Sequence, residues 1–410
     1  MAWVTDLHPT KSELDACVQC GLCLPHCPTF RLTGLETASP RGRLAAMSAV
    51  SHGLAEVDQE FADVVGFCLQ CRACEPVCPG LVPFGRAMEG ARAEVAAQVP
   101  DPRRARRHRL LRRVLVSRSW RRSLTAGAAL AQRARLGGVM PGPLRLGLRG
   151  LRRLPMRPPE VLGGTWEPSG PVRATAALLA GCVMEPWFDP VHRAVIELLT
   201  LGGYRVTVPS GQTCCGALAA HDGAAQLARE LAEVNRAAFR SFDLIVADAA
   251  GCSAHLKEYE HWTDGGEQVA SRARDAVEVV AALIDEGLLR RRQPTGDLVA
   301  VQDPCHLRHA QRLVEAPRKI VDAAGYSVVD LDEGGFCCGA AGLYSLVQPE
   351  ASARLGAAKA EQVAKSGARI VASANPGCEM QLRSHLDQSI TIAHPIELYA
   401  NAIRPELVGR

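Results

Sequence analysis

Short apolar runs alternate with amphipathic stretches through the C-terminal half of the chain. The runs Ala174–Ala180 and Leu244–Ala247 predict buried strands. Between them, apolar residues recur every three to four positions in Val191–Leu201 and Gln226–Arg240, which predicts helices. A short strand is also predicted at Arg205–Val208. Such alternation is typical of βαβ units on a parallel sheet.

The same order of elements occurs a second time, with strands predicted at Leu298–Gln302, Ser327–Leu331 and Arg369–Ser373. Each copy carries four cysteines, two of them adjacent and followed by glycine. They are Cys182, Cys214, Cys215 and Cys252 in the first copy, and Cys305, Cys337, Cys338 and Cys378 in the second. The offset is 123 residues from Cys182 to Cys305 and 126 residues from Cys252 to Cys378, which indicates an internal duplication. We expect one module at residues 171–290 and another at 291–410, with every cysteine just beyond the carboxyl end of a strand.

Residues 1–100 show a different pattern, in which short helical stretches separate two cysteine runs. Apolar residues after Pro40 and within Glu56–Val65 predict a pair of helices. The first run is Cys17-x2-Cys20-x2-Cys23-x3-Cys27-Pro28, and the second is Cys68-x2-Cys71-x2-Cys74-x3-Cys78-Pro79. We expect a mostly α-helical domain that closes around both runs.

The spacing of both runs is that of bacterial ferredoxins with two [4Fe–4S] clusters, in which the fourth cysteine of each run binds the other cluster. Cluster 1 is therefore expected on Cys17, Cys20, Cys23 and Cys78, and cluster 2 on Cys27, Cys68, Cys71 and Cys74. Zinc sites instead use paired Cys-x2-4-Cys hooks, which this spacing does not match. The sequence therefore predicts a ferredoxin-type domain that moves electrons.

The segment between Arg103 and Arg157 contains seventeen arginines and no acidic residue. Because the whole chain carries a net charge of +4, the remaining residues carry −13. Apolar residues recur at helical spacing from Arg103 to Arg122, so residues 101–170 are predicted to form an Arg-rich helical linker. The segment is either a solvated linker or a basic amphipathic surface for anionic lipid or an acidic subunit. No nucleic-acid recognition motif occurs, and aromatic residues for base stacking are almost absent.

The composition is that of a soluble globular protein, with 410 residues of which 47% are hydrophobic and 22% charged. Met1–Asp6 lack the basic and apolar regions of an export signal, so the sixteen cysteines are expected to stay reduced in the cytosol. No apolar run reaches the roughly 18 residues that a membrane-spanning helix needs. We expect a cytoplasmic protein, with peripheral attachment to the inner face of the cell membrane as a candidate role for the Arg-rich segment.

The two Cys-Cys-Gly motifs predict ligand sites, because neighbouring residues rarely form a relaxed disulfide. The glycine after each pair lets the backbone turn tightly beside a bound group. The four thiolates of a module are able to hold a third or fourth iron–sulfur cluster or zinc. The alternative is that they only pack as small apolar groups. His255 and His306 are candidate extra ligands or proton carriers. Arg41 and Arg43 are candidates either to raise a cluster potential or to form surface ion pairs.

These residues together resemble the iron–sulfur subunit of glycolate oxidase (glycolate dehydrogenase). The resemblance covers nearly the whole chain and includes the two cysteine runs, Pro40–Arg43, both Cys-Cys-Gly motifs, Pro304–Gln311 and Ala374–Cys378. The C-terminal half also looks like the cysteine-rich (CCG) domain of heterodisulfide reductase. That enzyme's pattern closes each module with Cys-x2-Cys, whereas His255 and Gln381 occupy the second position here. The departure favours the glycolate oxidase subunit, whose pattern lacks these cysteines too.

The resemblance implies that a separate flavoprotein oxidises glycolate to glyoxylate on FAD. This chain would relay the electrons through two [4Fe–4S] clusters toward a quinone or another membrane acceptor, without acting on glycolate itself. The absence of a G-x-G-x-x-G fingerprint after a strand agrees with FAD in a partner. The alternatives are the iron–sulfur subunit of a lactate or glycerol-3-phosphate dehydrogenase, or a thiol/disulfide enzyme similar to heterodisulfide reductase.

Overall fold

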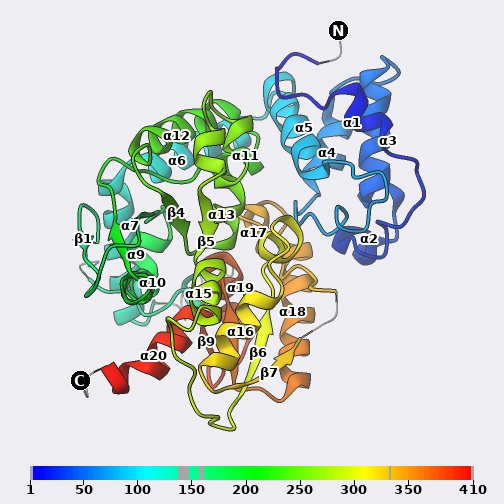
Figure 1. The fold of residues 1–410 in the computed structure, drawn as a ribbon. Helices are drawn as coiled ribbons and strands as arrows, with labels where there is room; N and C mark the ends of the chain where they lie inside the picture. Colours follow the sequence, from blue (N-terminus) through cyan, green and yellow to red (C-terminus); the bar gives the residue numbers. More distant parts are fainter. Residues whose placement is uncertain (1–2, 137–146, 157–160, 332–333, 408–410) are drawn as a thin grey trace.

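A computed structural model describes residues 3–136, 147–156, 161–331 and 334–407 (Figure 1). The N-terminal part is helical, as expected, and its buried centre includes Met47, Val50 and Met88. Its elements are α1 (Lys11–Asp15), α2 (Pro28–Thr33), η1 (Glu36–Ala38), α3 (Pro40–Ser51), α4 (Gln59–Gly66) and α5 (Phe84–Gln98). The hydroxyl of Ser39 accepts a hydrogen bond from the Gly42 amide at 2.9 Å and so caps α3, which has proline in its first turn.

Two sheets form the C-terminal part, in the green and the yellow-to-red regions of Figure 1. The first contains β1 (Thr165–Trp166), β2 (Ala174–Leu178), β3 (Tyr204–Thr207), β4 (Leu244–Ala247) and β5 (Ala273–Asp275), in the order β1-β3-β2-β4-β5. The second contains β6 (Leu298–Gln302), β7 (Ser327–Asp330), β8 (Ile370–Ser373) and β9 (Thr391–Ala393), in the order β7-β6-β8-β9. The parallel strands β2 to β5 have the same relative order as β6 to β9, so the fold confirms the duplication and the fold class.

Helices cover both sheets. Those of the first module are α9 (Met184–Trp187), α10 (Asp189–Leu201), α11 (Ala217–His221), α12 (Ala225–Ala238), α13 (Ala250–Leu256), η3 (Tyr259–His261), α14 (Glu267–Ala270) and α15 (Ala276–Asp285). Those of the second are η4 (His306–Ala310), α16 (Glu315–Ala323), α17 (Tyr344–Val347), α18 (Pro349–Ser366), α19 (Pro376–His385) and α20 (Pro395–Leu407). One buried core joins the modules and includes Leu198 of α10, Ile320 of α16 and Tyr399 of α20.

The predicted linker packs on both modules. It forms α6 (Pro102–Val116) and α7 (Arg118–Arg133), and Leu111 and Leu115 of α6 enter the core of the first module. Further along, Arg152 forms ion pairs with Glu379 and Glu397 of the second module at 2.6 and 2.7 Å. Arg145 and Arg157 lie outside the described residues. The domain limits proposed from the sequence stay predictions.

Strand β1 was not expected. It pairs with β3 antiparallel, with Thr165 opposite Thr207, and adds an edge to the otherwise parallel first sheet. A run of two residues carries no readable periodicity, so only its pairing reveals it.

Candidate functional site

The four thiols predicted to hold cluster 1 surround one small cavity. Cys17, Cys20, Cys23 and Cys78 line it, together with Cys74 of the other set and the apolar side chains of Leu44, Val82 and Phe84. Gly21 turns the first loop at a φ of 81°, which only glycine adopts without strain. Arg41 also lines this cavity and donates a hydrogen bond to the Gln19 carbonyl at 3.1 Å.

The thiols predicted to hold cluster 2 line a second, neighbouring cavity. They are Cys27, Cys68, Cys71 and Cys74, and the other lining residues include Pro40, Arg43 and Phe84. The backbone amide of Gln70 donates a hydrogen bond to the Cys68 sulfur at 3.3 Å. Burial raises the pKa of the Cys71 and Cys74 thiols, so that a cation or a metal is needed to hold them as thiolates.

The fold thus brings together each crossed set, with Cys78 beside the first run and Cys27 beside the second. Four thiols with an apolar wall are the donor set that a [4Fe–4S] cluster requires, so these residues fit the group; their ligation stays a prediction. Within the part of the chain that the structure describes, no group of three or more His, Cys, Asp or Glu side chains is arranged to hold a single metal ion.

The two candidate arginines differ in their surroundings. Arg43 is fully buried, and its guanidinium donates to the carbonyls of Val64 and Ala38 at 3.0 and 2.9 Å. It also lies 4.0 Å from the Cys27 sulfur, so its charge faces the second set. Arg41 is partly exposed and pairs with Glu36 at 2.7 Å. Of the two candidate roles, Arg41 thus forms a surface ion pair, whereas Arg43 forms none with the described carboxylates and lies beside a predicted cluster ligand.

The four cysteines of the first module come together, because they follow three adjacent strands at their carboxyl ends. The Cys182 and Cys214 sulfurs are 3.3 Å apart, and those of Cys215 and Cys252 are 3.2 Å apart. The hydrogen bond with Cys214 and burial together raise the pKa of Cys182. His255 is buried close to Gly216, with no hydrogen-bond partner for its Nε2 atom among the described residues.

The second module gathers its cysteines in the same way, but their electrostatic setting differs. Hydrogen bonding with the Cys337 and Cys378 thiols lowers the pKa of the Cys338 thiol well below its usual range, and the charge of Lys359 lowers it further. The side-chain amide of Asn375 also donates to the Cys378 sulfur at 3.5 Å. Gln381, in place of a further cysteine, donates instead to the Ser352 carbonyl at 3.1 Å.

The second module also contacts the cluster 2 loop. Cys305 and Cys337 share a buried apolar group with Leu69 and Tyr344, against which Cys71 packs. Cys71 is close enough to Cys305 for the two sulfurs to interact electrostatically. A further contact joins α2 to the second module: the Arg31 guanidinium lies 3.8 Å from the centre of the Phe336 ring. The cluster 2 set and the second cysteine set are therefore direct neighbours.

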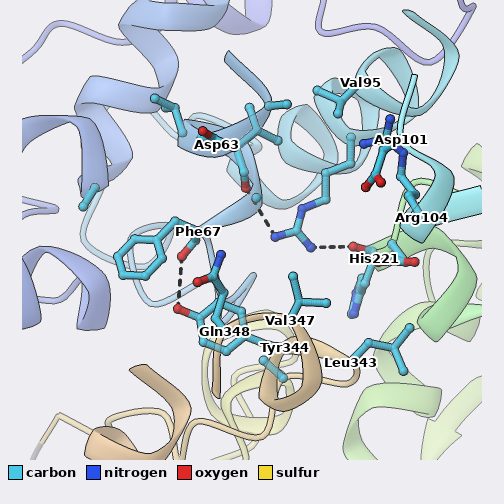
Figure 2. A pocket seen from close by; sticks show the side chains of 18 of the residues that line it. Asp63, Phe67, Val95, Asp101, Arg104, His221, Leu343, Tyr344, Val347 and Gln348 are labelled. Carbon is cyan, nitrogen blue, oxygen red and sulfur yellow. Dashed lines mark hydrogen bonds between the residues drawn. The ribbon is translucent and has the colours of Figure 1, made fainter. Parts of the chain in front are cut away.

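A cavity of about 490 Å³ lies beside this contact (Figure 2). Phe67 and Tyr344 form part of its wall, and the Tyr344 hydroxyl donates to the Phe67 carbonyl at 3.4 Å. Ala38, whose carbonyl accepts a hydrogen bond from the Cys27 thiol at 3.5 Å, lines it as well. Its volume is in the range of small-molecule sites. A small molecule that entered would therefore be separated from the cluster 2 set by a single layer of residues.

Several residues around these sites were not singled out from the sequence. Glu89, His221 and Tyr344 are separated in the chain and belong to three different parts of the fold, so no local spacing relates them. Glu89 carries a raised pKa through burial, which no sequence pattern reveals.

Comparison with known proteins finds both the N-terminal cluster domain and the duplicated cysteine-rich modules. A model of the 4Fe-4S dicluster domain matches residues 13–82, and a model of the cysteine-rich domain (CCG) matches residues 176–257 and 299–383. The probable glycolate oxidase iron-sulfur subunit of Bacillus subtilis (strain 168) is 33% identical over 401 residues, which cover 92% of this chain and 90% of the relative. The chain belongs to the glycolate oxidase iron–sulfur subunit family.

Two further relatives share less sequence identity with the chain. The glycolate oxidase iron-sulfur subunit of Escherichia coli (strain K12) is 29% identical, with 96% of this chain and 95% of the relative covered. Lactate utilization protein A of Oceanobacillus iheyensis is 27% identical over 54% of this chain and 95% of the relative. These comparisons confirm the resemblance read from the cysteine motifs.

In the described residues, no helix has the length and apolar character needed to cross a bilayer.

Proposed function

We propose that this protein is the electron-transfer subunit of a flavin-dependent glycolate dehydrogenase. The observation that carries the proposal is the pair of crossed cysteine sets, the second of which lies against Cys305 of the duplicated region. Bound [4Fe–4S] clusters would each take up and release one electron at a time. The chain's own residues supply the thiolates, apolar wall residues such as Val82 and Phe84, and the charge of Arg43.

The substrate chemistry is assigned to a partner. Conversion of glycolate to glyoxylate releases two electrons and two protons, and a flavoprotein subunit with FAD would take up both electrons before passing them on singly. The names of the relatives support glycolate as the substrate and a multi-subunit complex. The cavity beside Phe67 and Tyr344 supports access of a small acceptor, such as a quinone, to the cluster 2 side.

The test combines the protein, reconstituted with iron and sulfide, with its flavoprotein partner. Glycolate, D-lactate, L-lactate and glycerol 3-phosphate are added in turn, and cluster reduction is followed by electron paramagnetic resonance. Rapid reduction by glycolate is expected. Reduction by a lactate or by glycerol 3-phosphate alone would show that the protein serves one of those dehydrogenases instead. Clusters that remain oxidised with all four substrates would overturn the electron-transfer role in this enzyme class.

The short sulfur–sulfur distances of the first module favour one second candidate, a thiol/disulfide reaction at the Cys-Cys-Gly sites. Thiols in contact, as at Cys215 and Cys252, are what thiol–disulfide exchange uses. Replacement of Cys214 and Cys337 by serine separates the candidates. Electron transfer that is unchanged in this double variant excludes a reaction at the doublets.

A further inference from the structure

The arginines of α6 and α7 divide into an inward and an outward group. The inward arginines are neutralised or hydrogen-bonded within the fold, as in the pairs of Arg107 with Asp222 at 2.7 Å and Arg121 with Glu185 at 3.0 Å. Arg112 is 56% exposed, but it also pairs with an acidic residue of the first module, Glu230, at 2.8 Å. These arginines fasten the two helices to the first module, so a large part of the basic charge read from the sequence is structural.

The outward face of α6 is basic and apolar at once. Arg103, Arg106, Arg109 and Arg113 are all exposed, and none of them forms an ion pair with a carboxylate among the described residues. Leu110 and Val116 lie on the same face, with 53% and 52% of their surface exposed. This face is opposite to Leu111 and Leu115, whose side chains enter the core.

Helix α7 continues this face with large apolar side chains. Trp120, Leu124 and Leu130 are 44%, 44% and 59% exposed, whereas Thr125 and Ala129 on the opposite side are buried. The Arg113 guanidinium lies 5.9 Å from the centre of the Trp120 ring, which joins the outward faces of the two helices. We call this surface the α6–α7 face; it consists of Arg103, Arg106, Arg109, Leu110, Arg113, Val116, Trp120, Leu124 and Leu130.

We propose that the α6–α7 face binds the surface of an anionic lipid bilayer. Arginines without a carboxylate partner would lie at the headgroup phosphates, while Trp120 and the leucines enter the boundary between headgroups and acyl chains. A bilayer fits this face better than an acidic protein does, because exposed leucines and tryptophan are mixed with the arginines along two helices that carry no acidic residue from Arg103 onward. Because the face is positively charged, the expected lipid is an anionic one.

This inference gives the electron-transfer subunit proposed above a place beside a membrane acceptor. Lipid binding is measured without substrate, flavoprotein or electron transfer. The two proposals can therefore fail independently of each other.

The experiment measures sedimentation of the full chain with vesicles of phosphatidylcholine, with or without phosphatidylglycerol. Binding is expected only with phosphatidylglycerol, and it should weaken as salt rises from about 0.05 to 0.5 M because the charges become screened. In the face variant, Arg103, Arg106, Arg109 and Arg113 are all replaced by glutamine. Since each arginine near an anionic surface contributes roughly fivefold to the partition coefficient, a loss of more than about a hundredfold is expected.

A matched control removes the same net charge elsewhere. Arg86, Arg193, Arg205 and Arg291 are also exposed, at 51%, 53%, 45% and 54% of their side chains, and are replaced by glutamine together. The control should bind vesicles like the unchanged protein. Equal losses in both variants would show a general charge effect and overturn the proposal.

The apolar part of the face is tested separately with Trp120→Ser and Leu124→Ser. Weaker vesicle binding at unchanged thermal stability is expected, together with loss of the blue shift in tryptophan fluorescence that vesicles cause. Vesicle binding that persists unchanged in the face variant would overturn the proposal. So would the absence of vesicle binding combined with capture of an acidic flavoprotein through the same arginines.

Discussion

The imidazole rings of His221 and His306 stack with their centres 5.2 Å apart and their planes 13° from parallel. A carboxyl oxygen of Glu89 lies 3.4 Å from Nε2 of His221. These three residues come from the N-terminal domain, the first module and the second module. Burial raises the pKa of Glu89 to about 8 and lowers that of His306 to about 3. The three parts of the fold thus meet at groups that are held neutral.

Glu89 predicts a pH-dependent stability. Its folded-state pKa of about 8 lies above the ordinary 4.5, so its contribution is present at low pH and is lost as pH rises from 4.5 through about 8. The amide introduced by Glu89→Gln cannot ionise. The difference in melting temperature, variant minus unchanged protein, should therefore increase between pH 5 and about pH 8.5. Glu350→Gln, at an exposed position, serves as the control. A difference that stays constant with pH would contradict the assignment.

The crossed cysteine sets predict how the iron content responds to double variants. Cys17→Ser and Cys78→Ser belong to the same predicted cluster, so their combination should lose no more iron than either change alone. Combining Cys78→Ser with Cys71→Ser removes one ligand from each predicted cluster and should lose about twice as much. Iron analysis and electron paramagnetic resonance of the purified variants measure this. If Cys78→Ser and Cys71→Ser instead destroyed a common cluster, the crossed assignment would be wrong.

Arg43 predicts a loss of stability that Arg41 does not share. In Arg43→Met, the carbonyls of Ala38 and Val64 lose a buried charged donor, and unfolding should become easier by about 2–4 kcal/mol. The cluster near Cys27 should also shift to a lower reduction potential, because a positive charge is removed beside it. Arg41→Met changes a partly exposed ion pair and should have little effect on stability. Urea unfolding and a redox titration check both variants.

Arg152 predicts that residues 147–156 stabilise the second module. Its guanidinium donates two hydrogen bonds to Glu379 and two to Glu397, all between 2.6 and 2.7 Å. Arg152→Met would leave Glu397 without a cation partner among the described residues and Glu379 with Arg383 alone, and should destabilise the protein by about 3 kcal/mol. Arg153→Met, at the exposed neighbouring position, is the matched control and should change the unfolding midpoint little. Equal midpoints for the two variants would show that the segment is a passive connection.

Local patterns predicted much of the fold. The run Leu244–Ala247 coincides with β4, and the expected strand at Ser327–Leu331 ends one residue earlier as β7. An apolar run of this length, flanked by helical patterns, is readable as a strand of a parallel sheet. The edge strand β1 contains two residues and was not found. The cysteine spacings predicted two crossed sets; each set lines one cavity, and its ligation of a cluster stays a prediction.

Contacts between distant parts were not predictable in the same way. The arginine count indicated a basic segment, but it did not separate Arg121, which pairs with Glu185, from Arg113, which lies beside Trp120. That separation depends on which side of a helix meets the core. The packing of Cys71 against the Cys305 group likewise depends on how whole domains dock, for which a single sequence holds no periodic signal.

The ion pairs of Arg152 join parts of the chain that are synthesised at different times. Glu397 follows Arg152 by 245 residues, so on the ribosome the arginine emerges long before its partner. Domains fold as units from the N-terminus, and the helices of the first module are synthesised before α20. Arg152 can therefore form its ion pair with Glu397 only when translation is nearly finished. Until then the nascent first module lacks the second module against which α10 packs, so apolar residues of α10 such as Leu198 stay uncovered.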